Sequence, residues 1–204
     1  MDIGVSESKP HRFTVAEYYR MTEAGLFAEN SRVELIRGEI IDMAAIGTPH
    51  FVTVNRLTRL LVLAVGDRGI VSVQNPLRLD DSSEPEPDIV VFKAQADEYE
   101  SGPPTPDDAL LVIEVADTSL AYDRSVKAPL YAESGIADYW IVNVQDRTVE
   151  VYRTPAGGRY ADVQTARPGD MLTPLLLPGV ALPVADVLRQ SAGGWDRAGL
   201  PGPA

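Results

Sequence analysis

The sequence contains no cysteine and only two histidines. Disulfide bonds and thiolate zinc sites are therefore excluded, and any bound metal has to be held by oxygen ligands or by those histidines. Long apolar runs are also missing, because the longest, Leu60 to Val65, is far too short to cross a bilayer. The segment Met1 to Pro10 is polar and lacks the apolar core of a signal peptide. These absences predict a soluble, cytoplasmic protein.

Basic residues are scarce as well. The chain has 18 lysines and arginines against 30 aspartates and glutamates, a formal net charge of −12. Proteins that bind nucleic acid mainly through its phosphates usually carry a basic field, so this balance argues against a non-specific nucleic-acid binder. It does not exclude a nuclease, because metal ions and a local arginine patch can offset an acidic surround. We expect substrate affinity to be weak without a divalent metal.

The length and composition of the chain predict one globular domain. Its 204 residues are 45% hydrophobic and 24% charged, ordinary values for a soluble protein with a sizeable core. The polar start and the Gly/Pro-rich end favour ragged termini. We therefore predict a flexible N-terminus over 1–11, a single domain over 12–190 and a disordered tail over 191–204.

Apolar periodicity and turn residues predict a mixed α/β (α+β) architecture. Residues 13–24 have helical spacing, with Thr14 as N-cap, Glu17 three residues later and Gly25 as a stop. Two β-prone runs around Arg37-Gly38 predict a hairpin over 32–43. The remaining expected elements are a helix over 50–65, strands over 70–73, 76–79, 88–92 and 110–115, a Pro-rich loop over 101–108, a helix over 122–134, strands over 138–143 and 148–153, a short covering strand over 175–179 and a helical turn over 184–188.

Two carboxylates occupy positions where buried strands normally carry apolar residues. Glu114 interrupts the apolar run Leu110 to Val115, and Asp88 stands at the start of Ile89-Val90-Val91-Phe92. Unpaired buried carboxylates are costly, so they persist where something compensates their charge. Mg²⁺ is one such partner, held by one or two carboxylates and keeping other positions for water and phosphate. An Asp, a Glu on the next strand and a nearby Lys would form a phosphodiester-cleaving site.

Several motifs follow one another along the chain. They are Glu34-Leu-Ile-Arg-Gly-Glu, Pro49-His50, Pro87-Asp88-Ile-Val-Val, Val112-Ile-Glu114-Val, Asp123-Arg-Ser-Val-Lys127 and the run from Tyr131 to Val142. This ordered set, over roughly residues 12–190, resembles the bacterial Uma-type family of restriction endonucleases, within the PD-(D/E)XK nuclease superfamily. The resemblance implies a restriction-endonuclease-like fold: a mixed sheet flanked by helices, with the active site at one sheet end. It also implies Mg²⁺-dependent hydrolysis of DNA phosphodiester bonds, with Mn²⁺ as a substitute.

The resemblance also assigns roles to individual residues. Asp88 and Glu114 match the family's metal-binding carboxylates, and the backbone carbonyl of Val115 would be a further ligand. The sequence departs from the superfamily pattern two positions after Glu114, where Ala116 replaces the expected lysine. Lys127 is similar to the lysine that the family carries on the following helix. The remaining candidates are Glu34 as a supplementary carboxylate and His50 as an auxiliary contact to phosphate or water.

Each assignment has a structural alternative. Asp88 follows a proline and could cap a turn, and Lys127 could form an exposed helical pair with Asp123 at i,i+4. Glu34 could face solvent from its hairpin, and His50 could simply begin a helix. Pro129 also disturbs the helix that carries Lys127.

Three functions remain open from the sequence. The first is a metal-dependent DNA endonuclease, which would act as a homodimer because cutting a duplex needs two active sites. The second is a nuclease fold without catalysis that serves as a binding or assembly module. The third is a hydrolase of RNA or another phosphodiester. The triad of Asp88, Glu114 and Lys127 favours the first.

Overall fold

The computed structural model describes residues 9–28 and 31–189. Its centre is a six-stranded sheet in the order β3-β4-β5-β6-β7-β8, in which β5 and β6 are parallel and all other neighbours are antiparallel. The strands are β3 (Gly69–Val73), β4 (Ile89–Lys93), β5 (Ala109–Ala116), β6 (Asp138–Asn143), β7 (Thr148–Ala156) and β8 (Arg159–Ala166).

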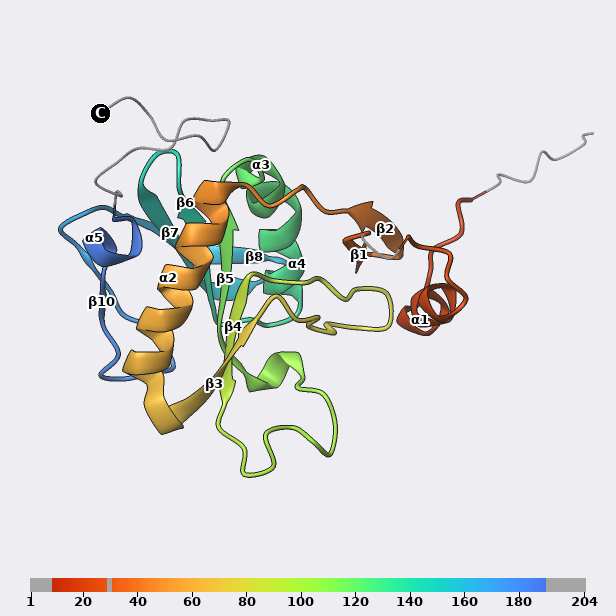
Figure 1. Ribbon diagram of the computed structural model, residues 1–204, viewed down its shortest axis with the longest axis horizontal. Helices are drawn as coiled ribbons and strands as arrows, with labels where there is room; N and C mark the ends of the chain where they lie inside the picture. The colour runs from red at the N-terminus through yellow and green to blue at the C-terminus, as the bar shows by residue number, and fades with distance from the viewer. Residues whose placement is uncertain (1–8, 29–30, 190–204) are drawn as a thin grey trace, which may run out of the picture.

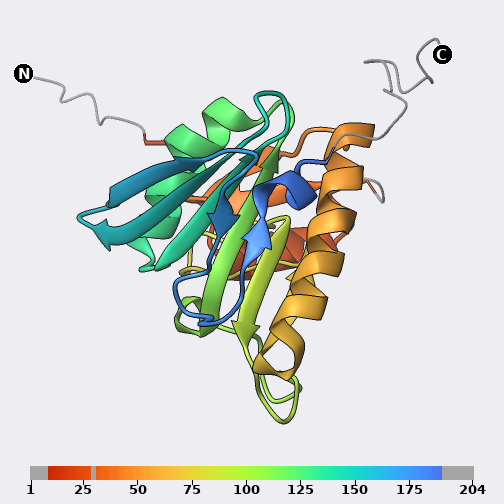
Figure 2. The ribbon, with the colours of Figure 1, turned by 90° about the vertical axis from the view of Figure 1, so that its left-hand side faces the viewer.

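Helices cover both faces of this sheet, as the sequence predicts. One face carries α2 (Thr48–Val65) and α5 (Val184–Val187), and the other carries the helical crossover between β5 and β6 (Figures 1 and 2). That crossover consists of α3 (Leu120–Tyr122), a π-helical turn (Asp123–Lys127) and α4 (Ala128–Glu133). The smaller elements are α1 (Val15–Glu23), the hairpin of β1 (Val33–Ile36) and β2 (Glu39–Asp42), the pair β9 (Met171–Leu172) and β10 (Leu182–Pro183), and two 3₁₀ turns at Gly66–Arg68 and Pro106–Asp108.

The two-residue period of β5 divides its buried side chains between two cores. Leu111, Ile113 and Val115 pack on the α2 side, while Val112 and Ala116 pack on the α4 side. Because side chains alternate along a strand, Glu114 shares its face with Val112 and Ala116. The one charged residue of β5 is therefore directed toward α4.

Local sequence signals explain the elements around this core. Thr14 caps α1 and forms a complete capping box with Glu17, as predicted. Arg37 and Gly38 both adopt positive φ, which makes the tight turn of the β1–β2 hairpin possible. The hairpin packs against the loop before β4, since Leu35 and Glu84 form an antiparallel bridge. Glu34 is thereby held beside the central sheet.

Two predicted strands are absent, and one strand of the central sheet is not predicted. Residues 175–179 form turns between β9 and β10 instead of the expected covering strand. Residues 76–79 form no strand; Leu77 and Leu79 instead donate to the carbonyls of Pro85 and Ser83, because the prolines around this segment leave too few N–H groups for a ladder. The strand β8 is not among the expected elements, because its side chains are mostly exposed and show no apolar alternation. The Gly157-Gly158 pair, with positive φ at both residues, is the available signal for its hairpin.

Within the described residues, no helix combines the length and the apolar character needed to traverse a bilayer. The predicted tail over 191–204 and most of the predicted flexible N-terminus lie outside those residues.

Candidate active site

Asp88 and Glu114 lie side by side at one end of the sheet. Ile89 of β4 pairs with Ile113 of β5, so Asp88, which immediately precedes β4, stands opposite Glu114. The Asp88 N–H donates to Glu114 Oε2 at 3.3 Å, and the Val115 N–H donates to Asp88 Oδ2 at 2.8 Å. The two carboxylates are therefore held next to each other, as the sequence predicts, by backbone groups of both strands.

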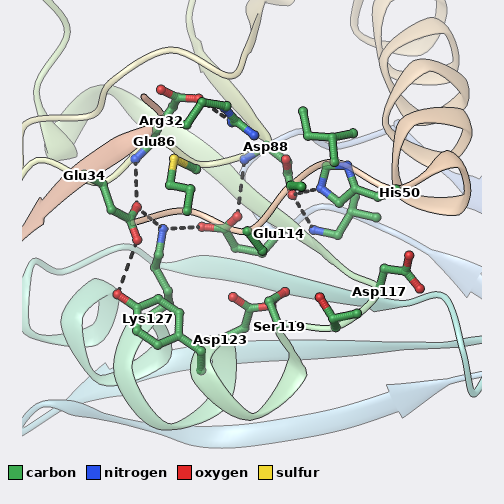
Figure 3. A pocket seen from close by; sticks show the side chains of 18 of the residues that line it. Arg32, Glu34, His50, Glu86, Asp88, Glu114, Asp117, Ser119, Asp123 and Lys127 are labelled. Atoms are coloured by element: carbon green, nitrogen blue, oxygen red, sulfur yellow. Dashed lines mark hydrogen bonds and ion pairs between the residues drawn. The ribbon is translucent and has the colours of Figure 1, made fainter. Parts of the chain in front are cut away.

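Lys127 reaches the same place from the crossover helix. Its Nζ lies 2.6 Å from Glu34 Oε2 and 3.2 Å from Glu114 Oε1, and its side chain is only 4% exposed (Figure 3). Asp123 accepts a hydrogen bond from the Ser119 hydroxyl at 2.7 Å and forms no ion pair with Lys127. The alternative of a solvated i,i+4 pair is wrong. The Lys127 ammonium therefore lies between two buried carboxylates.

The π-helical turn explains how Lys127 and Pro129 coexist. Pro129 has no N–H to donate and would press against the carbonyl four residues earlier in a regular helix. The Ala128 N–H donates instead to the carbonyl of Asp123, five residues back. This wider turn keeps the helix continuous and directs Lys127 inward, and such turns often occur at functional sites.

Glu34 is buried rather than solvated, so the alternative of a surface hairpin residue is also wrong. It is 3% exposed, and its carboxylate accepts from Lys127, from the Tyr122 hydroxyl at 3.3 Å and from the Glu86 N–H at 3.2 Å. The Lys127 ammonium lies closer to Glu34 than to Glu114. Glu34 therefore acts in this arrangement as the main counterion of Lys127.

His50 lies in the first turn of α2 and approaches Asp88 from the opposite side to Lys127 (Figure 3). Its Nε2 is 2.9 Å from Asp88 Oδ2. Its Nδ1 is buried and has no hydrogen-bond partner among the described residues. His50 thus does more than begin a helix, since it orients the Asp88 carboxylate.

Two contacts to the carboxylates are not predicted from the sequence. The Gln74 amide donates to Asp88 Oδ1 at 3.2 Å, and the buried Tyr131 hydroxyl donates to Glu114 Oε1 at 2.8 Å. Tyr131 follows Lys127 by four residues, which places both on one helical face and could have revealed it. Gln74 offers no such signal, because it follows the end of β3 in an irregular segment.

The charges of this cluster are unbalanced, and the pKa values reflect that. Burial, together with the nearby charge of Asp88, raises the pKa of Glu114 to about 8 although Lys127 acts in the opposite sense. Burial likewise raises the pKa of Asp123 to about 6. Burial alone would lower the pKa of Lys127, but the carboxylates of Glu114 and Glu34 outweigh it and raise that pKa. Binding of an additional cation or of a proton would therefore stabilise this cluster.

These carboxylates line a cavity of about 480 Å³. Among the described residues, no three His, Asp or Glu side chains form a ready-made cation cage. Mg²⁺ does not require one, because one or two protein carboxylates suffice when water and phosphate fill its other positions. The oxygens of Asp88 and Glu114 have the hard-donor chemistry that Mg²⁺ prefers, and the raised pKa of Glu114 indicates an uncompensated site. The donor set therefore fits Mg²⁺, while the contribution of the Val115 carbonyl stays a prediction.

The raised pKa of Glu114 predicts a pH dependence of stability. The unfolded chain releases this proton near the ordinary value of 4.5, whereas the folded chain keeps it up to about 8. Between these values the native state binds more protons, so the contribution of Glu114 to stability is fully present below about pH 4.5 and is lost as the pH rises toward 8. We expect the free energy of unfolding, measured in urea with EDTA, to fall by a few kcal/mol over this window.

The Glu114→Gln variant is the control for this measurement, because it cannot titrate. Its free energy of unfolding should change less between about pH 4.5 and 8 than that of the wild type. Parallel curves for the two proteins would show that Glu114 is not the titrating group.

Comparison with known proteins assigns the chain to a protein family. The sequence profile of the family Uma2, described as "Putative restriction endonuclease", matches residues 15–185. The chain belongs to this family. No curated protein matches it. Among solved structures, it is similar to a protein from Anabaena variabilis whose crystal structure is described as that of a putative nuclease, with 17% identity, a TM-score of 0.65 and coverage of 86% of this chain and 97% of that one.

Membership of the Uma2 family and this structural likeness confirm the predicted family and nuclease-like fold. At 17% identity the likeness concerns the fold alone.

Proposed function

We propose that this Uma2 protein is a Mg²⁺-dependent endonuclease that hydrolyses phosphodiester bonds of DNA. The observation that carries the proposal is the convergence of Asp88, Glu114 and Lys127, from three different elements, on one cavity. Two carboxylates and an ammonium are the groups that metal-assisted phosphodiester hydrolysis needs. The family description supports a nuclease-like activity.

Asp88 and Glu114 would hold the Mg²⁺. When bound, the ion would polarise the scissile phosphate and ease deprotonation of the attacking water. Gln74 and His50 fix the two oxygens of Asp88, and Tyr131 fixes Glu114, so the ligands are oriented before substrate arrives.

Lys127 would stabilise the charge that develops on the phosphate oxygens. Its ammonium has three N–H groups, of which Glu34 and Glu114 take two. The third can donate to a phosphate oxygen in the transition state, where a fixed donor in a buried site is most effective. Glu34 holds Lys127 in position and keeps it protonated, as the raised pKa of Lys127 indicates.

Cleavage of supercoiled plasmid tests this function. Purified protein with Mg²⁺ or Mn²⁺ should nick or linearise the plasmid, and EDTA should abolish the activity. A parallel assay with single-stranded RNA distinguishes DNA from another phosphodiester as substrate. If neither DNA nor RNA is cut with either metal, a binding or assembly module becomes the better account.

We propose in addition that the protein acts on duplex DNA as a homodimer. The described residues contain one cavity with this set of carboxylates, and cutting both strands needs two active sites. A symmetric dimer is the commonest way to supply the second.

A further inference from the structure

Arg32 is a second cation at the cavity, next to β1 on the hairpin. It precedes Glu34 by two residues, so both side chains leave the hairpin on the same side, toward the cavity that they line. Its carbonyl accepts the Met43 N–H at 2.9 Å, which anchors its backbone across the hairpin. Its side chain is 32% exposed, in contrast to the enclosed Lys127. The Arg32 side chain is therefore accessible to a ligand that enters from solvent.

Most of the hydrogen-bonding capacity of Arg32 is unused. Nη2 donates to Glu86 Oε1 at 2.6 Å, and the other guanidinium N–H groups have no acceptor among the described residues. Glu86 is itself partly exposed, at 24%, so the pair lies nearer to solvent than the enclosed Lys127 and Glu34. A guanidinium offers five donors in a planar fork that matches phosphate oxygens. The pair with Glu86 leaves enough of them for a phosphate.

The charge around the cavity makes such a donor necessary. Within the described part of the chain, its lining includes seven carboxylates against two permanent cations, Arg32 and Lys127. The carboxylates are Glu34, Asp42, Glu86, Asp88, Glu114, Asp117 and Asp123. Lys127 is already shared between two of them. An incoming phosphodiester is repelled by this lining unless a cation near the entrance compensates its charge.

We propose that Arg32 binds a phosphate oxygen of the substrate, and that Glu86 competes with the substrate for the guanidinium. This inference rests on the proposed function for the substrate class and adds the residue that captures it. Arg32 exchanges the carboxylate of Glu86 for the phosphate as substrate enters, which favours a nucleic-acid backbone over a neutral ligand.

Binding of a short fluorescein-labelled DNA duplex, followed by anisotropy with Ca²⁺ in place of Mg²⁺ and with the probe checked for cleavage on a gel, tests the proposal independently of hydrolysis. Arg32→Met keeps the length of the side chain and removes its donors, so we expect affinity to fall on the order of 10- to 100-fold. The slope of log K against log salt should decrease by about one phosphate contact, which a loss of packing alone would not produce. Glu86→Gln removes the competitor and should tighten binding by roughly 2- to 5-fold.

The neighbouring pair Arg37–Glu133 supplies matched controls. Arg37 lies on the same hairpin, its Nη2 is 2.8 Å from Glu133 Oε2, and neither residue lines the cavity. Arg37→Met and Glu133→Gln should therefore leave affinity and salt slope unchanged.

The outcomes separate this inference from the proposed function. Tighter binding by Glu86→Gln would also rule out misfolding as the cause of its effect, because a misfolded protein would not gain affinity. Equal losses for Arg32→Met and Arg37→Met, or no binding by the wild type, would overturn the role of Arg32. Binding that depends on Arg32 in a protein that cuts no phosphodiester would support Arg32 while refuting the nuclease.

Discussion

Asp88→Asn and Glu114→Gln should each lower the rate of plasmid nicking on the order of 10²-fold or more. Both changes keep the shape of the side chain and remove the negative charge that would hold the metal. Changes around a metal site, outside its direct ligands, typically cost 10- to 100-fold, so losing a ligand should cost at least that much. Asp42→Asn is the matched control, because it removes a carboxylate from the same cavity at an exposed position and should leave the rate nearly unchanged.

The two variants should differ in stability. In Asp88→Asn the amide oxygen can accept from His50 and the Val115 N–H while the NH₂ faces Gln74, whose own amide can turn to present oxygen. In Glu114→Gln either orientation of the amide sets its NH₂ against a group that can only donate, the Asp88 N–H on one side or the Lys127 ammonium on the other, a cost of about 1–3 kcal/mol. Urea unfolding measures this cost separately from activity. Nicking that survives in both variants would indicate a contaminating nuclease rather than this site.

Lys127→Met should have the largest effect on both activity and stability. It leaves the carboxylates of Glu34 and Glu114 buried without their cation, and breaking a buried pair in this way costs roughly 3–5 kcal/mol. Removing a donor to the developing charge should also lower the cleavage rate about 10²- to 10³-fold. Urea unfolding in EDTA and plasmid nicking measure the two effects.

A double variant separates the structural from the catalytic role of Lys127. Glu34→Gln combined with Lys127→Met removes one of the two stranded charges, and Glu114 can take up a proton because burial raises its pKa to about 8. Stability should therefore recover in large part while cleavage stays low. Lys93→Met, at an exposed position at the end of β4, is the control for losing a lysine. Cleavage restored together with stability in the double variant would contradict a catalytic role for Lys127.

Elements that depend on interactions between residues close together in the sequence could be predicted most reliably. The capping box of Thr14 and Glu17, the turn at Arg37-Gly38 and the strand over 138–143 all depend on short-range rules, and the structure contains each of them. Segments whose conformation depends on contacts with distant parts of the chain are harder to predict. The run over 76–79 has strand-like residues, but the loop that returns beside it is rich in proline and completes no ladder.

The site could be predicted only in part for the same reason. Glu114 stands out because a charge within an apolar strand needs compensation, and Asp88 because it begins the next such run. Lys127 pairs with Glu34, which is 93 positions away in the sequence. This pairing depends on how the hairpin packs against the crossover helix. No local pattern encodes that packing. Gln74 could not be predicted, because its contact with Asp88 arises only once that carboxylate is in place, whereas the helical spacing of Tyr131 from Lys127 is a usable signal.

The central claim is that Asp88 and Glu114 together hold a divalent cation, and diffraction from a crystal soaked in Mn²⁺ tests it most directly. We expect one anomalous peak between the two carboxylates, with oxygens of both about 2.1 Å from the ion, and no peak there in Asp88→Asn. A crystal in which Mn²⁺ binds elsewhere, with Asp88 and Glu114 contacted only by neighbouring protein groups such as His50 and Lys127, would contradict the account.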